Sequence, residues 1–151
     1  MRPLLIGQAP GPRSDPAEPL AGRCGARLAG LCGLGQPEFL ARFDRVNLTS
    51  RFPGKAGKGD ALVMPSPPQV VRLMVEIMQR RRTVLLGRFV AEMFDEAETP
   101  LFKWTEPFGP VSLLAVAPHP SGISRWFNDP SNLKRARKFW TQLANEAATA
   151  L

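Results

Sequence analysis

Four short apolar runs, each closed by polar or turn-forming residues, constrain the fold of this chain most strongly. They span residues 3–6, 43–48, 83–87 and 111–117. Apolar runs of this length between turn signals are typical of buried strands. The segments between and after them carry helical patterns, at residues 23–33, 36–42, 69–81, 88–96 and 132–148. Alternating strands and helices predict an α/β protein, a three-layer α/β/α domain around a four-stranded, mostly parallel sheet.

The length of the chain predicts one domain spanning residues 1–151. A chain of this size buries an adequate core, and a hydrophobic content of 44% is ordinary for a globular protein. The one long interruption is residues 49–68, where glycines and prolines predict a loop that is also basic. Its Gly-rich stretch, residues 54–60, lacks the spacing and the Ser or Thr of a nucleotide-binding phosphate loop.

The charge balance favours a polyanionic partner. The formal net charge is +7, and the sequence pI is about 10.4. Cationic side chains that neutralise phosphates release condensed counterions, so nucleic acid is the natural candidate. A solvated basic surface is the alternative.

Targeting segments and metal sites are not expected. The first predicted strand begins near residue 3, which leaves no room for a signal peptide, and no apolar run approaches the roughly 18–20 residues of a membrane span. We therefore expect a cytoplasmic protein without a membrane partner. Cys24 and Cys32 lie in a predicted helix and are interpreted as reduced thiols, too few for an iron-sulfur cluster. We expect no metal and no cofactor.

Two turn segments that follow the first and last predicted strands indicate a site. Residues 7–11 read Gly-Gln-Ala-Pro-Gly, and residues 119–122 read His-Pro-Ser-Gly with the only histidine of the chain. Parallel sheets place their chemistry at the carboxyl ends of the strands, where loops from distant parts of the chain converge. If these two strands are neighbours, Gln8 and His119 share one cleft.

These segments resemble the paired motifs of the uracil-DNA glycosylase superfamily. In that superfamily the first strand ends in a Gly-x-x-Pro-Gly type motif, and the last ends in His/Asn-Pro-Ser-Gly. Residues 15–28 and the Val46-Asn47 pair extend the similarity, which covers roughly residues 4–140. The resemblance implies an α/β/α fold with a four-stranded parallel sheet. It also implies excision of uracil or another deaminated base from DNA without a cofactor. Separately, we expect the protein to be a monomer.

The resemblance assigns the central roles to Asn47 and His119. The Asn47 amide oxygen would accept from uracil N3–H and its NH2 group would donate to O4, whereas cytosine reverses both partners and would be rejected. His119 would donate a hydrogen bond to O2 of the base and stabilise the departing anion. The alternative for His119 is a histidine that only ties the turn together.

Two positions depart from the superfamily pattern. Where other branches offer Asp, Asn or Glu to activate water, this chain has the catalytic candidate Gln8 followed by Ala9 in the base-binding wall. A glutamine orients water but cannot take its proton at neutral pH. Leu20 stands where an aromatic ring usually stacks on the flipped base. Phe52 is the candidate replacement for that ring, with a loop anchor as its alternative.

The remaining candidates are expected to contact the DNA backbone or the vacated base stack. Ser121 and the Gly122 backbone would grip phosphate, and Ile123 would act as an apolar wedge. The other DNA-binding candidates are Pro10, Gly11, Arg125 and Trp126. Packing of the loop onto the last helix is the alternative role for Trp126.

Two other functions stay open at this point. One is a non-catalytic DNA-binding or damage-sensing domain, suggested by the missing carboxylate at positions 8 and 9 and by Leu20. The other is a hydrolase acting on free nucleosides or nucleotides. The first predicts DNA binding without base release, and the second predicts turnover of monomers.

Overall fold

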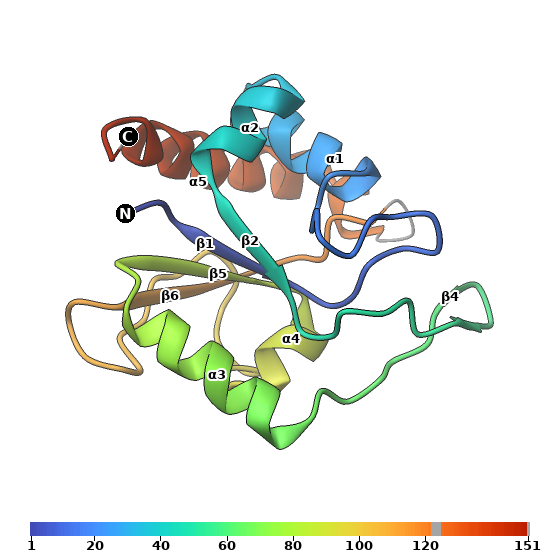
Figure 1. The fold of residues 1–151 in the computed structure, drawn as a ribbon. Coiled ribbons are helices and arrows are strands. Elements are labelled where there is room, and N and C mark those ends of the chain that lie inside the picture. Colours follow the sequence, from blue (N-terminus) through green and yellow to red (C-terminus); the bar gives the residue numbers. More distant parts are fainter. Residues whose placement is uncertain (122–124, 151) are drawn as a thin grey trace.

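A four-stranded parallel sheet forms the centre of the computed structural model, which describes residues 1–121 and 125–150 (Figure 1). Its strands run in the spatial order β2-β1-β5-β6, and every neighbouring pair is parallel. Their bounds are Leu4–Gly7 for β1, Asp44–Asn47 for β2, Arg82–Leu86 for β5 and Leu113–Ala117 for β6. The predicted sheet is therefore confirmed.

Helices cover both faces of the sheet and complete the three layers (Figure 1). One face carries α1 (Arg23–Cys32), α2 (Gln36–Arg42) and α5 (Pro130–Ala148). The other carries α3 (Pro67–Met78) and α4 (Arg88–Glu92). Successive strand residues point to opposite faces. Leu5 accordingly packs in the core beneath α5, whereas Ile6 packs in the core above α3, and both are fully buried.

Two helices begin earlier than their apolar patterns predict. α3 starts at Pro67 rather than at residue 69, with the Ser66 side chain accepting from the Gln69 N–H at 3.4 Å. α5 starts at Pro130 rather than at residue 132, with Asp129 accepting from the Ser131 N–H at 2.8 Å. Proline fits the first helical turn because the N–H it lacks has no partner within the helix there. Pro67 and Pro130 are therefore the first residues of these two helices.

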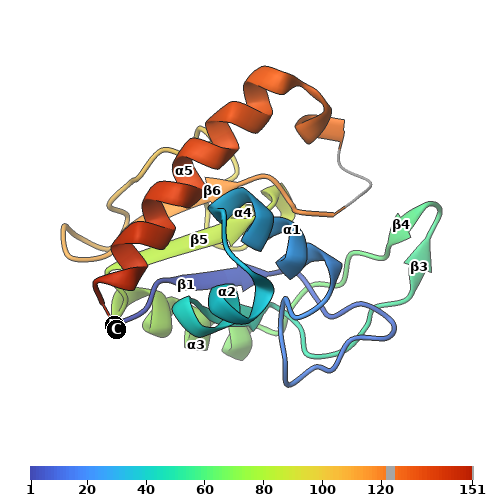
Figure 2. The same cartoon turned by 90° about the horizontal axis from the view of Figure 1, so that it is seen from above.

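Residues 49–68 are not one unbroken loop, which corrects the sequence prediction. They contain a small antiparallel hairpin of β3 (Lys55–Ala56) and β4 (Gly59–Asp60), and Lys55 lies opposite Asp60. Gly57 opens the two-residue turn with φ +63°, a conformation that favours glycine. An ion pair joins the Lys55 Nζ and an Asp60 carboxylate oxygen at 2.7 Å. Figure 2 shows this hairpin on the side of the molecule toward which β1 runs.

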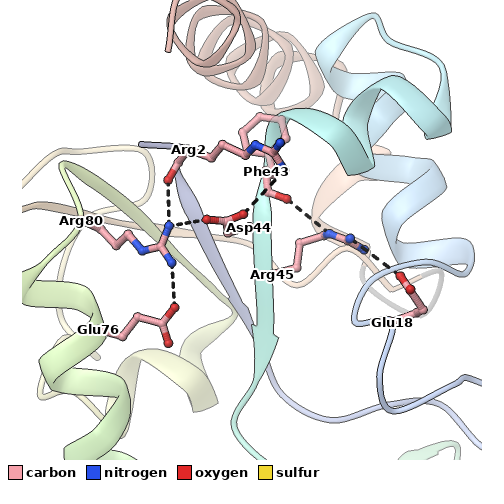
Figure 3. Close-up of polar contacts among 7 residues, drawn as sticks. All are labelled: Arg2, Glu18, Phe43, Asp44, Arg45, Glu76 and Arg80. Carbon is pink, nitrogen blue, oxygen red and sulfur yellow. Dashed lines mark hydrogen bonds and ion pairs between the residues drawn. The ribbon is translucent and has the colours of Figure 1, made fainter. Parts of the chain in front are cut away.

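Ion pairs hold the opposite end of β2. The Arg80 guanidinium contacts the Asp44 carboxylate and also donates to Glu76 at 2.9 Å, and Arg2 approaches Asp44 from the chain start at 3.9 Å (Figure 3). These groups connect β2 to the end of α3. Further along β2, Arg45 reaches the loop that precedes α1, which matters for the site.

Candidate functional site

A cavity of about 650 Å³ lies at the carboxyl ends of the strands and beside the β3–β4 hairpin. This volume is within the ordinary range of small-molecule sites. Most of the candidate site residues form its wall: Gln8, Ala9, Pro10, Gly11, Leu20, Asn47, His119 and Ser121. Gly122 and Ile123 lie outside the described residues. Phe52, Arg125 and Trp126 do not contribute to the wall.

Direct pairing of β1 with β2 brings Gln8 and Asn47 together. In the parallel register Gly7 lies opposite Asn47. Beyond the last paired residues, the Gly7 carbonyl accepts from the Leu48 N–H at 2.9 Å, and the Gln8 carbonyl accepts from the Thr49 N–H at 3.2 Å. The backbone thus holds the first motif and the Asn47 segment side by side.

The side chain of Asn47 occupies space that only a glycine leaves open. A Cβ atom on Gly7 would come within 2.6 Å of the Asn47 Oδ1. Asn47 is only 8% exposed, yet its carboxamide makes no hydrogen bond to another described residue. A nearly buried amide without a protein partner has hydrogen-bonding capacity left for a ligand.

The sequence predicted a shared cleft on the condition that β1 and β6 are neighbours. They are not neighbours, yet His119 still lines the same cavity. β5 lies between them. Its last residue is followed by Gly87, whose φ of +100° favours glycine and whose Cβ would lie 3.2 Å from the His119 Cβ. The Gly87 N–H donates to the Ala117 carbonyl at 2.8 Å. The missing side chain at position 87 therefore lets His119 lie over the end of β5.

The hydrogen bonding of His119 determines its tautomer. Its Nδ1 accepts from the Ser121 backbone N–H at 3.2 Å. A nitrogen that accepts carries no proton, so in the neutral ring the proton resides on Nε2. Burial lowers the pKa of His119 below its ordinary value, although the charge of Asp60 opposes this shift. At neutral pH the ring is therefore neutral and is a donor through Nε2.

Arg27 holds the segment that carries His119, and the sequence analysis missed it. The Arg27 Nη1 donates to the Ser121 carbonyl at 3.0 Å, and the guanidinium lies 4.2 Å from the centre of the Phe127 ring. Ser121 thus uses its carbonyl on Arg27 and its N–H on His119, which leaves its hydroxyl for other contacts. No local signal marks Arg27, because the contact joins residues 94 positions apart.

Leu20 is held in the wall by its backbone. It has φ +59°, which is unusual for a residue with a side chain, and its carbonyl lies where a Cβ on Gly25 would be only 1.6 Å away. The Arg45 guanidinium donates to the Pro19 carbonyl at 2.6 Å and lies 3.9 Å from the Glu18 carboxylate (Figure 3). Close packing on α1 and the clamp from β2 therefore position Leu20 beside Gly7 and Asn47.

The three candidates outside the cavity wall have other surroundings. The Trp126 ring centre lies 5.5 Å from that of Phe102 and 5.1 Å from that of Phe127, an arrangement that matches its packing alternative. Phe52 has the Lys55 ammonium 6.0 Å from its ring centre. Arg125 is exposed at the start of the short helix η1 (Arg125–Asn128).

The cavity contains carboxylates that the sequence analysis did not place there. Three acidic and three basic side chains line it: Asp15, Glu18 and Asp60 with Arg13, Arg23 and Lys55. The formal charge of the wall is therefore balanced, and the excess of +7 lies elsewhere on the chain. Asp60 lies on the β3–β4 hairpin, which brings it to the cavity. The Gly57-Lys58 turn is the sequence signal that could have predicted this hairpin.

Cys24 also lines the cavity, but it is not an activated nucleophile. Burial raises the pKa of its thiol, with Arg27 acting in the opposite direction. Burial likewise raises the pKa of Cys32 to about 12. Both cysteines are free rather than joined in a disulfide, as the sequence predicted. Thiols with raised pKa values stay protonated at neutral pH and are poor nucleophiles.

Comparison with known proteins assigns the chain to no family. No family model matches it, and no curated protein matches it at a significant level. Across residues 1–121 and 125–150, no three His, Cys, Asp or Glu side chains are grouped so that they could hold a metal ion. In the same ranges no helix has the length and apolar character needed to cross a membrane.

Proposed function

We propose that this protein is a monofunctional DNA glycosylase of the uracil-DNA glycosylase superfamily, acting in base excision repair on uracil or a related deaminated base. One observation carries the proposal. The unpartnered carboxamide of Asn47 and the imidazole of His119, a neutral Nε2–H donor, line one cavity at the carboxyl end of a parallel sheet. Their positions suit base recognition and leaving-group stabilisation.

The target nucleotide first leaves the base stack, because its glycosidic carbon is out of reach inside a duplex. Asn47 then reads the Watson-Crick edge of the base. Its oxygen accepts from N3–H and its NH2 group donates to O4 of uracil. Cytosine presents an acceptor at N3 and a donor at N4, so it leaves both groups of a carboxamide in this orientation unpaired.

His119 assists the cleavage itself. When the C1′–N1 bond breaks, its electron pair stays on the base, and positive charge develops on the sugar. A donor aimed at O2 stabilises the resulting anion, and a neutral imidazole is sufficient for this role. The lowered pKa of His119 supports it, because the donor is then present without protonation. Water adds to C1′, and Gln8 orients it through the amide oxygen.

DNA would reach this cavity along its rim. Pro10 and Gly11 lie in the wall, and the Ser121 hydroxyl is the remaining free group of its residue for a phosphate. Gly122, Ile123 and Arg125 follow directly in the chain and are proposed to contact phosphate and the vacated stack. The net charge of +7 supports this polyanionic partner. A cytoplasmic location belongs to the same proposal.

The test is base release from DNA. Single-stranded and double-stranded oligonucleotides carrying uracil, hypoxanthine or xanthine are incubated with the protein and then cleaved at abasic sites with alkali. We expect cleavage of at least one substrate. His119→Ala should reduce its rate by about 100- to 1000-fold, with DNA affinity retained. Absence of cleavage on all substrates would refute the catalytic proposal.

A non-catalytic DNA-binding or damage-sensing domain is the second candidate. Gln8 and Ala9, in place of an acidic residue, favour it, as does Leu20 in place of an aromatic ring. It predicts salt-sensitive DNA binding with no base release. Gln8→Glu separates the two functions, because activity gained by this variant would show that the rest of the cavity is competent.

A further inference from the structure

The first motif of the proposed glycosylase has no carboxylate, but other segments bring carboxylates to the cavity. Asp15, Glu18 and Asp60 all line it. The first two belong to the loop between β1 and α1. Asp60 comes instead from β4, in the hairpin that follows β2. The three can be compared by what already occupies their oxygens.

Asp15 and Glu18 are engaged with their own surroundings. The Asp15 Oδ1 accepts from the Ala17 N–H at 2.9 Å, which closes a local turn. The Glu18 carboxylate lies 3.9 Å from the Arg45 guanidinium, and its side chain is 59% exposed. Both groups therefore shape the loop that presents Leu20.

Asp60 lines the cavity from the hairpin, and its side chain is 39% exposed, less than that of Glu18. Its Oδ1 bonds the Lys55 ammonium at 2.7 Å across the hairpin, whereas its Oδ2 makes no hydrogen bond to another described residue. Burial lowers the pKa of His119, and the negative charge of Asp60 raises it. At Cys24, burial raises the pKa, Arg27 lowers it, and Asp60 adds a smaller contribution that raises it.

We propose that Asp60 is the catalytic carboxylate of this site. It supplies from the hairpin the acidic group that is missing at positions 8 and 9. This inference rests on the proposed glycosylase function. Asp60 Oδ2 accepts a hydrogen bond from the attacking water and takes its proton as the water oxygen bonds to C1′. The C1′–N1 bond breaks in the same reaction, and its electron pair leaves with the base, which His119 stabilises.

The ion pair with Lys55 gives this role a defined geometry. Because the ammonium holds one carboxylate oxygen, the other has a restricted direction. The hairpin register places the two residues opposite each other, so the turn at Gly57 determines where the carboxylate lies. Gln8 then orients the same water without accepting its proton.

The experiment measures single-turnover base release from a uracil-containing oligonucleotide by the full chain. Asp60→Asn should reduce the rate by about 100-fold or more, the usual contribution of a general base. Added formate should restore part of that rate, because it replaces the lost carboxylate. The control Asp44→Asn removes a paired carboxylate at the amino end of β2, outside the cavity, and should stay within about twofold of wild type, as substitutions away from a site generally do.

A second measurement tests the placement of Asp60 without using activity. His119 is the only histidine, so its ring protons give one assignable titration by NMR. Removing the charge of Asp60 should lower the pKa of His119 further, whereas Asp15→Asn should leave it unchanged. An unchanged pKa in Asp60→Asn would show that the carboxylate does not face the ring and would overturn the inference.

The possible failures are distinguishable. If wild type releases base and Asp60→Asn is equally fast, this inference fails and the glycosylase proposal stands. If Asp60→Asn is slow but formate restores nothing, Asp60 has a structural role and the catalytic assignment is wrong. If wild type releases no base from any substrate, the proposed function fails and the inference fails with it.

Discussion

The two ends of β2 treat their polar side chains in opposite ways. At the amino end, Asp44 pairs with Arg80 and approaches Arg2, and Arg80 also pairs with Glu76 (Figure 3). At the carboxyl end, three residues further along, Asn47 is more deeply buried and has no hydrogen-bond partner for its side chain among the described residues. One short strand thus carries both a polar group that ion pairs satisfy and one that is left open to the cavity.

This difference separates stability from function. The amide nitrogen and oxygen of Asn47 keep access to the cavity, so they can bond water or a ligand there. The charges around Asp44 satisfy one another at the surface and need no ligand. Asn47 lies in a cavity with His119 and Gln8, where a ligand would complete its hydrogen bonds. The following predictions test this contrast, from the largest expected effect to the smallest.

Gly7→Ala should have the largest effect at the carboxyl end. The new Cβ would come within 2.6 Å of the Asn47 Oδ1 and displace the carboxamide. Loss of a two-bond base contact costs about 1–3 kcal/mol, so we expect base release to slow by up to about 100-fold. Single-turnover kinetics measure this. Gly59→Ala, also in the cavity but with open space around its Cβ, is the control and should remain active.

Gly25→Ala should mainly lower stability. Its Cβ would lie 1.6 Å from the Leu20 carbonyl oxygen, so the loop or the helix must move. Such overpacking costs about 1–3 kcal/mol. Gly30→Ala in the same helix has nothing within 4 Å and should stabilise by about 0.5–1 kcal/mol, as Ala does over Gly in helices. Urea unfolding compares the two, and equal effects would contradict the packing of Leu20 on α1.

Arg27→Ala should release the His119 segment. Without the bond to the Ser121 carbonyl, the Ser121 N–H no longer has a fixed position against the His119 Nδ1. We expect about tenfold slower base release, the equivalent of one lost hydrogen bond of about 1.4 kcal/mol. Nitrogen NMR of the single histidine should show a less pure Nε2–H tautomer. Arg23→Ala removes the same charge from the same helix, and an equal loss there would point to charge instead of anchoring.

The pH dependence of stability should reveal His119. Burial lowers its pKa in the folded protein, so the unfolded chain binds a proton more readily. As pH falls below the ordinary value of 6.5, the free energy of unfolding should therefore decrease in wild type. His119→Asn removes this component. Urea unfolding at pH 7.5 and 5.5 measures it, and parallel curves for both proteins would argue against a buried, neutral ring.

Asp44→Asn should have the smallest effect, on stability alone. The Asp44 side chain is 36% exposed, and partly exposed ion pairs contribute about 1 kcal/mol or less. Base release should be unchanged, because the group lies at the amino end of β2. Thermal unfolding and the base-release assay measure the two properties. If Asp44→Asn folded normally but lost most of its activity, the amino end of β2 would also serve function, and the contrast between the two ends would be wrong.

Local sequence patterns were enough to predict most elements of the fold. The apolar runs and the one-sided helix patterns identified the four strands of the sheet and the helices to within a few residues. Errors arose where one residue type has two meanings. Pro67 and Pro130 were taken as helix breakers or left outside the helices, but both open helices. The short hairpin at Lys55–Ala56 and Gly59–Asp60 was missed because its surrounding glycines were interpreted as loop residues.

The sequence by itself determined which polar groups follow the strands, because a buried parallel strand must end in a turn that carries its polar residues to the sheet edge. Gln8 and His119 were identified on this basis, whereas the base-reading role of Asn47 was expected from the resemblance of its segment to a known family. Only the tertiary structure decided how they meet. β5 separates β1 from β6, Gly87 leaves the space that His119 fills, and Arg27 and Asp60 arrive from distant segments. Such contacts depend on strand order and on the room that absent side chains leave, and neither is a local property of the chain.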